Sequence, residues 1–488
     1  MCVCGSEELL EKYKEVIMNE NTKKVPLFGS GSFYMRALGL ALPIMLQQLI
    51  QNLVSLIDNF MVAGLGDISM SGVNVAGQLL FVFLVYLNTI CMSGGIFLTQ
   101  FFGAKDEEGM KQAYRFKIIM GLAAFIPFTL VCLIFPREVL SLLLIGNTQA
   151  DLILDEAVSY IRLVFFMGIP MTISMCMASS LRDIGEVKQP LVATIIATLT
   201  NTFFNWVLIY GNLGAPRMGV RGAAVATVIA RCVELVLFII IFLKRRPKFY
   251  VGIKEFLHVD WKLFGEILKK GSLILFCEMV WVFSETLTTA VYNGRGGADV
   301  VSGMSASFAI ANLYFVAFGG IYSATAVIIG KSLGEGDLEL AKKQKRWLLS
   351  GCGVFGCVMT VFGLCTTFLI PIVFGRLSRE ALMICREMVI LMSFFMPTWV
   401  YMNAQQAIAR AGGDTKMGAY TDAGLTILIL IPAVLLLGIF TEVGPVFLYG
   451  VVKILDIIKV FIFHFWLKKE LWLRNLTVEE DQKLDAKA

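Results

Sequence analysis

Apolar stretches of membrane-spanning length follow one another along most of the chain. The hydrocarbon core of a bilayer is about 30 Å thick, so a helix needs roughly 20 apolar residues to cross it. Runs such as 235–243 are continuously apolar and lack the alternation of barrel strands, which predicts helices. The twelve predicted spans are 34–60, 73–101, 117–136, 157–180, 190–211, 221–243, 271–293, 301–330, 347–374, 383–408, 417–439 and 443–467.

The second half of the chain repeats the Gly-rich and charged signals that separate the spans of the first half. The matched pairs are 64–67 with 294–297, 103–106 with 334–337, and 182–188 with 410–416, at spacings of 230, 231 and 228 residues. Three matches at nearly one spacing indicate an internal duplication, which is common among transporters. Because each half has an even number of spans, both halves share one orientation. The prediction is an all-α integral membrane protein of 12 transmembrane helices in two six-helix lobes, related by a pseudo-two-fold axis along the membrane normal.

The repeat and the spans together divide the chain into five predicted parts. They are a cytoplasmic leader (1–32), an N-lobe with the first six spans (33–243), a cytoplasmic loop between the lobes (244–270), a C-lobe with the last six spans (271–468) and a cytoplasmic tail (469–488).

The distribution of basic residues predicts the topology. The termini and alternate loops on one side carry 30 Lys and Arg residues, and the loops on the other side carry 7. The positive-inside rule therefore places both termini in the cytoplasm of a multi-pass protein of the plasma membrane. Residues 1–32 are charged and have no apolar core, so no cleavable signal peptide is expected. The expected environment is the lipid bilayer, with no nucleic-acid partner and a monomeric state.

Composition argues against a soluble protein and against an enzyme. Hydrophobic residues make up 57% of the chain and charged residues 16%, far from soluble domains. The two histidines, His258 and His464, cannot supply a zinc or di-iron site. The Gly330-Lys-Ser sequence resembles the end of a phosphate-binding loop, but Thr325 stands where a glycine is needed. We therefore expect no cofactor other than a coupling ion, H⁺ or Na⁺, and no metal beyond Na⁺ at Asp58.

Polar residues inside the first-lobe spans form one candidate site. A charge at the bilayer centre costs about 2.5–3.5 kcal/mol, so an intramembrane acid such as Asp58 suggests a function. Asn201 and Asn205 are four residues apart and share one helix face, and Thr227 follows on the next span. The alternative is an acid at the membrane interface together with amides that only link helices.

Two acids in the seventh span form a second candidate site. Glu278 and Glu285 are seven residues apart and share roughly one face, with no basic residue on their helix. Trp281 between them offers a ring for cation–π contact. Asn403 and Gln406 in the tenth span are further candidates for the substrate cavity, although such amides also serve as links between helices. The expected substrates are small organic cations.

Several of these motifs together resemble the MATE (multidrug and toxic compound extrusion) transporters. The likeness covers roughly 35–475, and helix seven and the end of the chain resemble a clostridial-type branch. It is carried by Leu56–Gly66, by Gly103-Ala-Lys, by Leu181-Arg with Gly185 and Lys188-Gln-Pro, by Gly219 with Gly222–Thr227, by Arg410–Lys416, by Cys277-Glu with Trp281, and by Trp472–Thr477.

The resemblance implies two six-helix bundles around a V-shaped cavity, and a cation site at Asp58. It also marks a departure, because family members often have an aspartate where this chain has Asn205. An amide cannot bind or release a proton near neutrality, which leaves Asp58 as the titrating group.

The function expected from these observations is a cation-coupled (H⁺ or Na⁺) antiporter that exports amphipathic organic cations by alternating access. Two alternatives stay open at this point. One is a flippase of lipid-linked oligosaccharides or polysaccharides in the same superfamily, which usually needs an Arg-rich cavity to hold pyrophosphate. The other is a membrane-embedded enzyme or channel.

Overall fold

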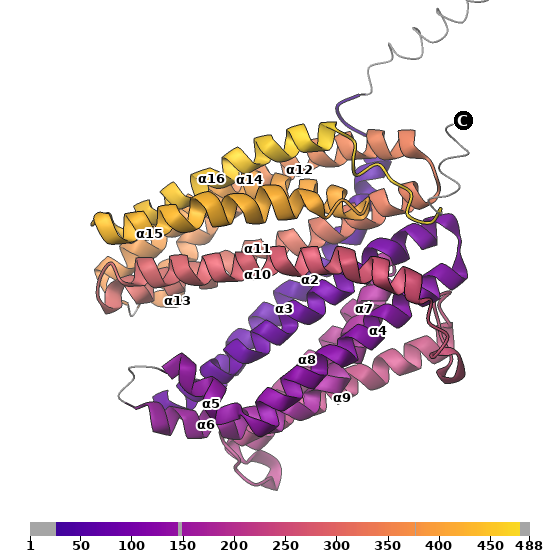
Figure 1. The fold of residues 1–488 in the computed structure, drawn as a ribbon. Coiled ribbons are helices and arrows are strands. Elements are labelled where there is room, and N and C mark those ends of the chain that lie inside the picture. The colour runs from indigo at the N-terminus through magenta and orange to yellow at the C-terminus, as the bar shows by residue number, and fades with distance from the viewer. Residues whose placement is uncertain (1–25, 145–148, 376, 479–488) are drawn as a thin grey trace, which may run out of the picture.

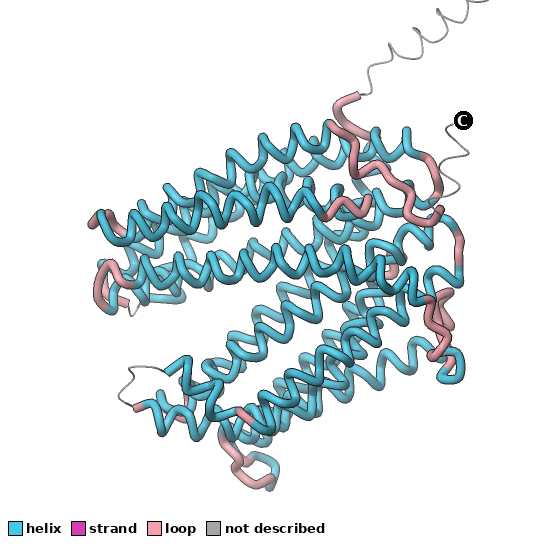
Figure 2. Tube along the Cα trace, in the orientation of Figure 1, coloured by secondary structure: helices cyan, strands magenta, loops and turns pink. Residues whose placement is uncertain are grey.

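The computed structural model describes residues 26–144, 149–375 and 377–478, and these ranges hold helices, turns and loops without a strand (Figure 2). Four of the long segments change helix type along their length. The third span ends in π-helix, Leu130–Ile134, and the eleventh begins with two π-helical segments, Gly418–Ala423 and Thr426–Leu430, before α15. Short 3₁₀ turns join α6 to α7 in the fourth span and α12 to α13 in the ninth.

The helices have the following bounds. They are α2 (Gly31–Ala63), α3 (Asp67–Ala104), α4 (Glu107–Thr129), α5 (Pro136–Ser141), α6 (Ala150–Val164), α7 (Gly168–Asp183), α8 (Lys188–Tyr210), α9 (Val220–Arg245), α10 (Trp261–Asn293), α11 (Ala298–Gly334), α12 (Leu338–Thr366), α13 (Ile370–Phe374), α14 (Arg379–Ala411), α15 (Ile431–Phe440) and α16 (Pro445–Lys468).

All twelve predicted spans have a helical counterpart. Eleven helical segments in the described ranges are long and apolar enough to cross a membrane. The twelfth, α16, carries Lys453, Asp456 and Lys459 near its middle. The seventh span starts earlier than predicted, because Asp260 caps α10 by accepting hydrogen bonds from the backbone N–H groups of Lys262 and Leu263. The charged first turns of α10 hid this extension from a hydropathy argument.

The helices form two groups that converge at one end of the molecule and diverge at the other (Figure 1). One group contains α3 to α9 and the other α11 to α16, and each has its own hydrophobic core. The loop between α9 and α10 and both ends of the described chain lie at the end where the groups converge (Figure 1). The predicted architecture of two six-helix lobes is confirmed, and we call the convergent end the closed end.

The first helix of each lobe packs against the other lobe near the closed end. Ala41 and Met45 of α2 belong to the C-lobe core, whereas Val62 at the far end of α2 belongs to the N-lobe core. In the same way Ile267 and Ile274 of α10 belong to the N-lobe core. Thus α2 and α10 tie the lobes together, because each of them contributes residues to both cores.

Two glycines of the repeat allow a close backbone contact between the lobes. A Cβ on Gly103 of α3 would overlap the backbone of Lys331 in α11, and one on Gly334 of α11 would overlap the backbone of Gln100 in α3. Only glycine permits such an approach of two backbones. The repeated Gly-x-x-Asp signal therefore marks the point where the two lobes meet.

The described part of the C-terminal tail fills the closed end. The side chain of Gln100, completely buried, donates hydrogen bonds to the carbonyls of Ala411 (2.7 Å) and Arg474 (3.2 Å) and accepts one from the Leu476 N–H (2.7 Å). Trp472 is completely buried in the C-lobe core, and Leu476 packs against the N-lobe core. The chain after α16 therefore bridges both lobes.

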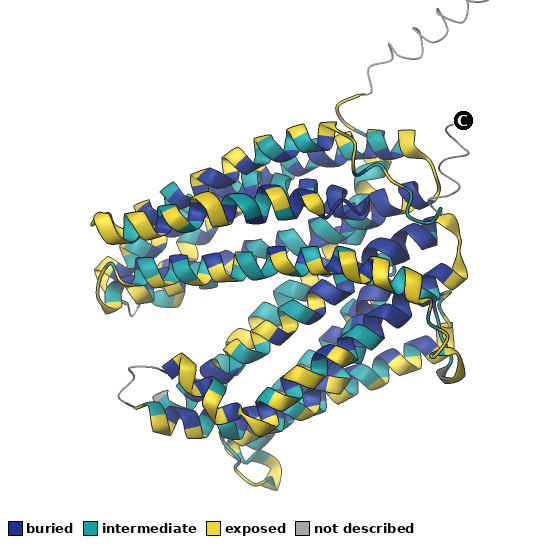
Figure 3. Cartoon of the chain, in the orientation of Figure 1, coloured by how far each residue is buried: buried dark blue, intermediate teal, exposed yellow. Residues whose placement is uncertain are grey.

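Apolar side chains cover the periphery of both lobes. Phe368 and Ile372 are 76% and 77% exposed, and exposed positions follow the outer faces of many helices (Figure 3). Exposed apolar surface on this scale is unusual for a protein in water and is the expected surface toward lipid.

We expect Trp472→Ala to lower the melting temperature of the purified protein in detergent. Truncation of a buried Trp costs about 3–5 kcal/mol, and here it also releases a segment that bridges the lobes. Trp261→Ala is the matched control, because Trp261 is 71% exposed and its loss should change the melting temperature little. Equal melting temperatures for the two variants would contradict the anchoring role of the tail.

Candidate functional site: a cavity between the two lobes

A cavity of about 1350 Å³ lies between the lobes. Both lobes line it, with side chains from α2, α3, α7 and α9 on one wall and from α10, α11, α14 and α16 on the other. The inter-lobe contacts around Gln100 and Gly103 close it at one end. Such a volume exceeds the usual pocket for a drug-sized molecule, about 300–1,000 Å³.

Most charged side chains that line the cavity are paired within the protein. Each of the six acids, Asp183, Glu234, Glu278, Glu285, Asp422 and Asp456, forms an ion pair with a basic side chain. Five basic residues also line the cavity, namely Arg182, Arg231, Arg410, Lys453 and Lys459. Pairing lowers the cost of holding charges in a membrane protein.

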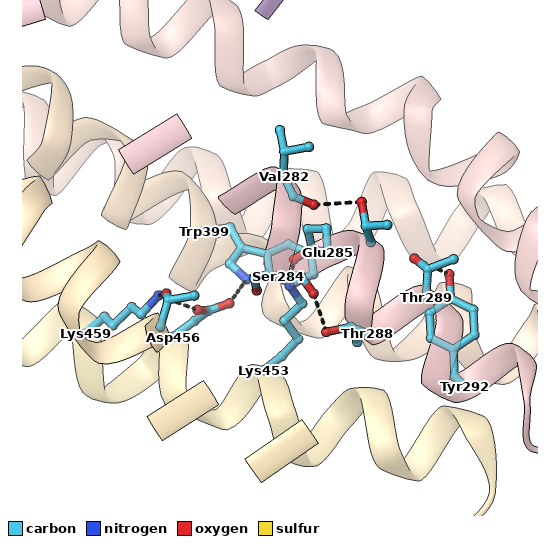
Figure 4. Close-up of polar contacts among 12 residues, drawn as sticks. Val282, Ser284, Glu285, Thr288, Thr289, Tyr292, Trp399, Lys453, Asp456 and Lys459 are labelled. Carbon is cyan, nitrogen blue, oxygen red and sulfur yellow. Dashed lines mark hydrogen bonds and ion pairs between the residues drawn. The ribbon is translucent and has the colours of Figure 1, made fainter. Parts of the chain in front are cut away.

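The two acids predicted on helix seven lie in the cavity wall, but they are not isolated. Glu278 pairs with Arg410 of α14 at 3.1 Å, and Glu285 pairs with Lys453 of α16 (Figure 4). The predicted span 271–293 has no basic residue, and both basic partners come from other helices. Trp281, 51% exposed, also lines the cavity.

The pairs on the C-lobe wall continue as a network of hydrogen bonds. Lys459 contacts Asp422 at 2.7 Å. It also lies 3.9 Å from Asp456, to which the Trp399 indole N–H donates a hydrogen bond at 2.9 Å (Figure 4). The Gln406 amide donates to Asp422 at 2.9 Å. The predicted residue Gln406 is therefore part of the charged wall.

Asn403 also lines the cavity as expected. Its amide oxygen is buried and has no hydrogen-bond partner among the described residues. An unsatisfied acceptor beside a cavity is a natural contact for a ligand or a water molecule.

A second network lies on the N-lobe wall. Arg231 and Glu234 form the pair within α9 that their spacing favours, at 2.6 Å. The Thr194 hydroxyl donates to Glu234 at 3.4 Å and accepts a hydrogen bond from the Gln47 amide at 2.8 Å. Lys117, completely buried, pairs with Asp183.

The four residues predicted as a cation site come together within the N-lobe, outside the lining of the cavity. The Asn205 amide donates to an Asp58 carboxylate oxygen at 2.7 Å and contacts the Asn201 amide at 3.2 Å, and Asn201 lies 3.4 Å from the Thr227 hydroxyl. The amide oxygen of Asn205 is buried and has no hydrogen-bond partner among the described residues. We call Asp58, Asn201, Asn205 and Thr227 the Asp58 cluster.

One amide atom of Asn201 lies 2.8 and 3.2 Å from the two carboxylate oxygens of Asp58. As a nitrogen, this atom donates hydrogen bonds to Asp58. As an oxygen, it needs a proton or a cation between it and the carboxylate, because two acceptors repel at this distance. The donor set is a carboxylate, two amide oxygens and a hydroxyl, which suits a proton or a hard cation such as Na⁺.

The basic partners on the C-lobe wall are the residues that sequence reasoning missed. Arg410 stood in the repeated motif, and Lys453 and Lys459 are charges inside a predicted span. A charged residue inside a membrane span is a functional candidate by its position alone, and this signal could have identified Lys453 and Lys459. The geometry brings the predicted residues together, while their roles in transport stay predictions.

Membrane-length helices in two lobes around a central cavity are the architecture of a membrane transporter. The sequence matches the MatE family over residues 43–207 and 274–436, one match in each lobe. The chain belongs to this family, whose members are membrane transporters.

Bacterial relatives cover most of the chain at low identity. The chain is 27% identical over 319 residues to the probable multidrug resistance protein NorM of Thermotoga maritima, a match that covers 64% of this chain and 66% of that protein. It is 23% identical over 409 residues to the probable multidrug resistance protein NorM of Halalkalibacterium halodurans, covering 83% and 87%. It is also 23% identical over 355 residues to the uncharacterized transporter YisQ of Bacillus subtilis, covering 72% and 75%.

Solved structures of the family share the fold. A MATE transporter in complex with MaL6 superposes with a TM-score of 0.80 at 18% identity, over 92% of this chain and 98% of that chain. The outward-facing conformation of a multidrug resistance MATE transporter gives a TM-score of 0.79 at 17% identity with the same coverage. A MOP-superfamily transporter from Pyrococcus furiosus, described as having a binding pocket of reverse polarity, gives 0.76 at 17% identity.

We expect Glu285→Gln and Lys453→Gln each to destabilise the protein more than the two substitutions together. Each single variant leaves one charge without its partner, which costs about 3–5 kcal/mol for a buried pair, whereas the double variant leaves no charge. Melting temperatures of the four proteins in detergent form the double-mutant cycle. A double variant that loses the sum of the two single effects would show that the pair does not stabilise the wall.

Proposed function

We propose that the protein is a cation-coupled antiporter that exports amphipathic organic compounds, with inward flow of H⁺ or Na⁺ as the energy source. One observation carries this proposal: a large cavity closed at one end lies beside a separate, oxygen-rich cluster around Asp58. Two lobes that can rock against each other around a central cavity suit alternating access, and the cluster beside the cavity offers a place for a coupling ion.

The coupling ion is assigned to the Asp58 cluster. Asp58 is the only acid in the cluster, so any proton exchange there must use its carboxylate. Each ion gains about 2.3 kcal/mol per 100 mV of membrane potential, and a proton gains about 1.4 kcal/mol per pH unit. A one-for-one exchange with a monovalent cation moves no net charge, so a proton then supports about a tenfold substrate gradient per pH unit. A substrate without net charge also gains the contribution of the membrane potential, about 2.3 kcal/mol per 100 mV.

The cationic group of the substrate is assigned to the C-lobe wall. Four acids there, Glu278, Glu285, Asp422 and Asp456, face three bases, Arg410, Lys453 and Lys459. This wall thus has one negative charge in excess when all seven groups are ionised. The exposed ring of Trp281 adds an apolar surface that attracts a delocalised cation.

The orientation follows from charge. Both ends of the described chain and the loops on the side with 30 basic residues lie at the closed end, so the positive-inside rule places the closed end in the cytoplasm. The cavity then opens to the outside, and the described conformation is outward-facing. We propose a monomer in the plasma membrane with both termini in the cytoplasm.

Export of small organic compounds is favoured over movement of lipid-linked sugars. The relatives from Thermotoga maritima and Halalkalibacterium halodurans are named as multidrug resistance proteins. Of the five basic residues that line the cavity, four are paired with acids, so the wall lacks the free cluster that a pyrophosphate needs.

Asp58→Asn should abolish gradient-driven efflux and leave substrate binding nearly unchanged, because the substituted amide cannot carry a proton or neutralise a bound cation. The measurement is efflux of a fluorescent organic cation from proteoliposomes under separate Na⁺ and pH gradients, together with equilibrium binding in detergent. The wild type should respond to one of the two gradients, which identifies the coupling ion.

Asp151→Asn is the matched control for this experiment. Asp151 has a side chain that is 94% exposed and lies on α6, away from both sites. It should export at the wild-type rate. Efflux by Asp58→Asn at that rate, with an unchanged pH profile, would assign coupling to another acid.

A cysteine introduced at Lys254 tests the orientation. Lys254 is exposed in the loop at the closed end. With Lys254→Cys in intact cells, a membrane-impermeant maleimide should leave the new thiol unlabelled until the membrane is permeabilised. Strong labelling of this thiol in intact cells, above the background of the parent protein, would reverse the proposed topology.

A further inference from the structure

Arg182, at the end of α7, differs from every other charged residue of the cavity wall. It is half-buried and lines the cavity, yet its side chain forms no ion pair or hydrogen bond within the described part of the chain. The nearby carboxylates of Asp183 and Glu234 attract Arg182, but each of them forms its ion pair with another base, Lys117 and Arg231 respectively. The N-lobe wall therefore has a cation with no anion of its own.

The internal repeat shows what Arg182 lacks. Its counterpart in the second half, 228 residues later, is Arg410, which pairs with Glu278. The residue 230 positions before Glu278, at the matching place in α2, is Gln48. An amide therefore stands in the N-lobe where the C-lobe has the neutralising carboxylate.

The side chain of Gln48 also lines the cavity and packs closely against Gly319 of α11. An amide cannot neutralise an arginine, so the positive charge of Arg182 remains available to the cavity. Together with Lys117, the partner of Asp183, the N-lobe wall has three bases and two acids. The bases are Lys117, Arg182 and Arg231, and the acids are Asp183 and Glu234.

We propose that Arg182 binds an anionic group of the substrate, such as a carboxylate or a sulfonate. This inference rests on the proposed export function and makes it more specific. The N-lobe wall has one positive charge in excess and the C-lobe wall one negative charge. A zwitterionic amphipathic compound that spans the cavity neutralises both, with its anion at Arg182 and its cation near the C-lobe acids.

An arginine is suited to this role. The guanidinium binds a planar carboxylate through two parallel hydrogen bonds, and it keeps its charge at every physiological pH. Within a partly closed cavity such a contact is stronger than in water. The protein should therefore distinguish a zwitterion from an ester of the same compound.

The test uses rhodamine B, which carries a carboxylate and a delocalised cation, and its ethyl ester, which carries only the cation. Binding of each dye to the purified full-length protein is measured by fluorescence polarisation. Arg182→Gln should weaken the binding of rhodamine B about tenfold or more and change that of the ester less than about twofold. Arg182→Lys, which keeps the charge, should restore much of the loss.

Arg217→Gln is the matched control, because it removes one positive charge from an exposed loop outside the cavity lining. It should leave the binding of both dyes unchanged. Equal weakening of both dyes by Arg182→Gln would overturn the proposal and make Arg182 a support of the cavity wall. Equal binding of both dyes before and after the substitution would overturn it as well.

A second measurement needs no variant and covers the case in which Arg182→Gln does not fold. Benzenesulfonate should displace rhodamine B from the wild-type protein and leave the ester bound. Displacement of neither dye, or of both, would contradict an anion site at Arg182.

Efflux of the ester from proteoliposomes separates the two proposals. If the ester is exported but the two dyes respond alike to Arg182→Gln, the anion site fails and export stands. If neither dye is exported but Arg182→Gln weakens the binding of rhodamine B and not that of the ester, the anion site stands and the transport function fails.

Discussion

The close approach of α3 and α11 at the closed end is the contact on which the cavity depends. Gly103 and Gly334 let the two backbones touch where any side chain would separate them. Helices that meet so closely at one end and carry larger side chains along the rest of their length have to diverge toward the other end. Because the two glycines occupy matching places in the repeat, one contact occurs twice about the pseudo-two-fold axis. The cavity is therefore a consequence of the duplication.

The second constraint is that charge in a membrane needs compensation. An unpaired charge at the bilayer centre costs about 2.5–3.5 kcal/mol, and eleven charged residues line the cavity of this protein. Pairs such as Glu278 with Arg410 and Asp183 with Lys117 meet that cost inside the protein. Polar walls can then line a cavity without destabilising the lobes. Against this background a single uncompensated residue such as Arg182 stands out as available for a ligand.

The spans and the repeat could be predicted because both depend on local sequence. Apolar length determines a span, and the glycines recur at a nearly constant spacing. The Asp58 cluster was also accessible, since helix periodicity placed Asn201 and Asn205 on one face. The pairing of Glu285 with Lys453 could not be predicted from the sequence, because the partners are 168 residues apart and meet only through the packing of α10 against α16. The early start of α10 was hidden by its charged first turns.

The arrangement of polar groups also indicates how an ion could influence the cavity. Thr227 of the Asp58 cluster lies one turn before Arg231 on α9. A movement of α9 at Thr227 therefore also moves Arg231. Arg231 pairs with Glu234, and Thr194 links Glu234 to Gln47 of α2, the helix that also carries Asp58. Both α2 and α9 thus contribute to the ion cluster and to the cavity wall. Because α2 also packs against the C-lobe core, a change in the hydrogen bonds of Asp58 acts on a helix shared by both lobes. Energetic coupling needs such an element with two arrangements that both sites can bias, and α2 meets the structural part of this requirement.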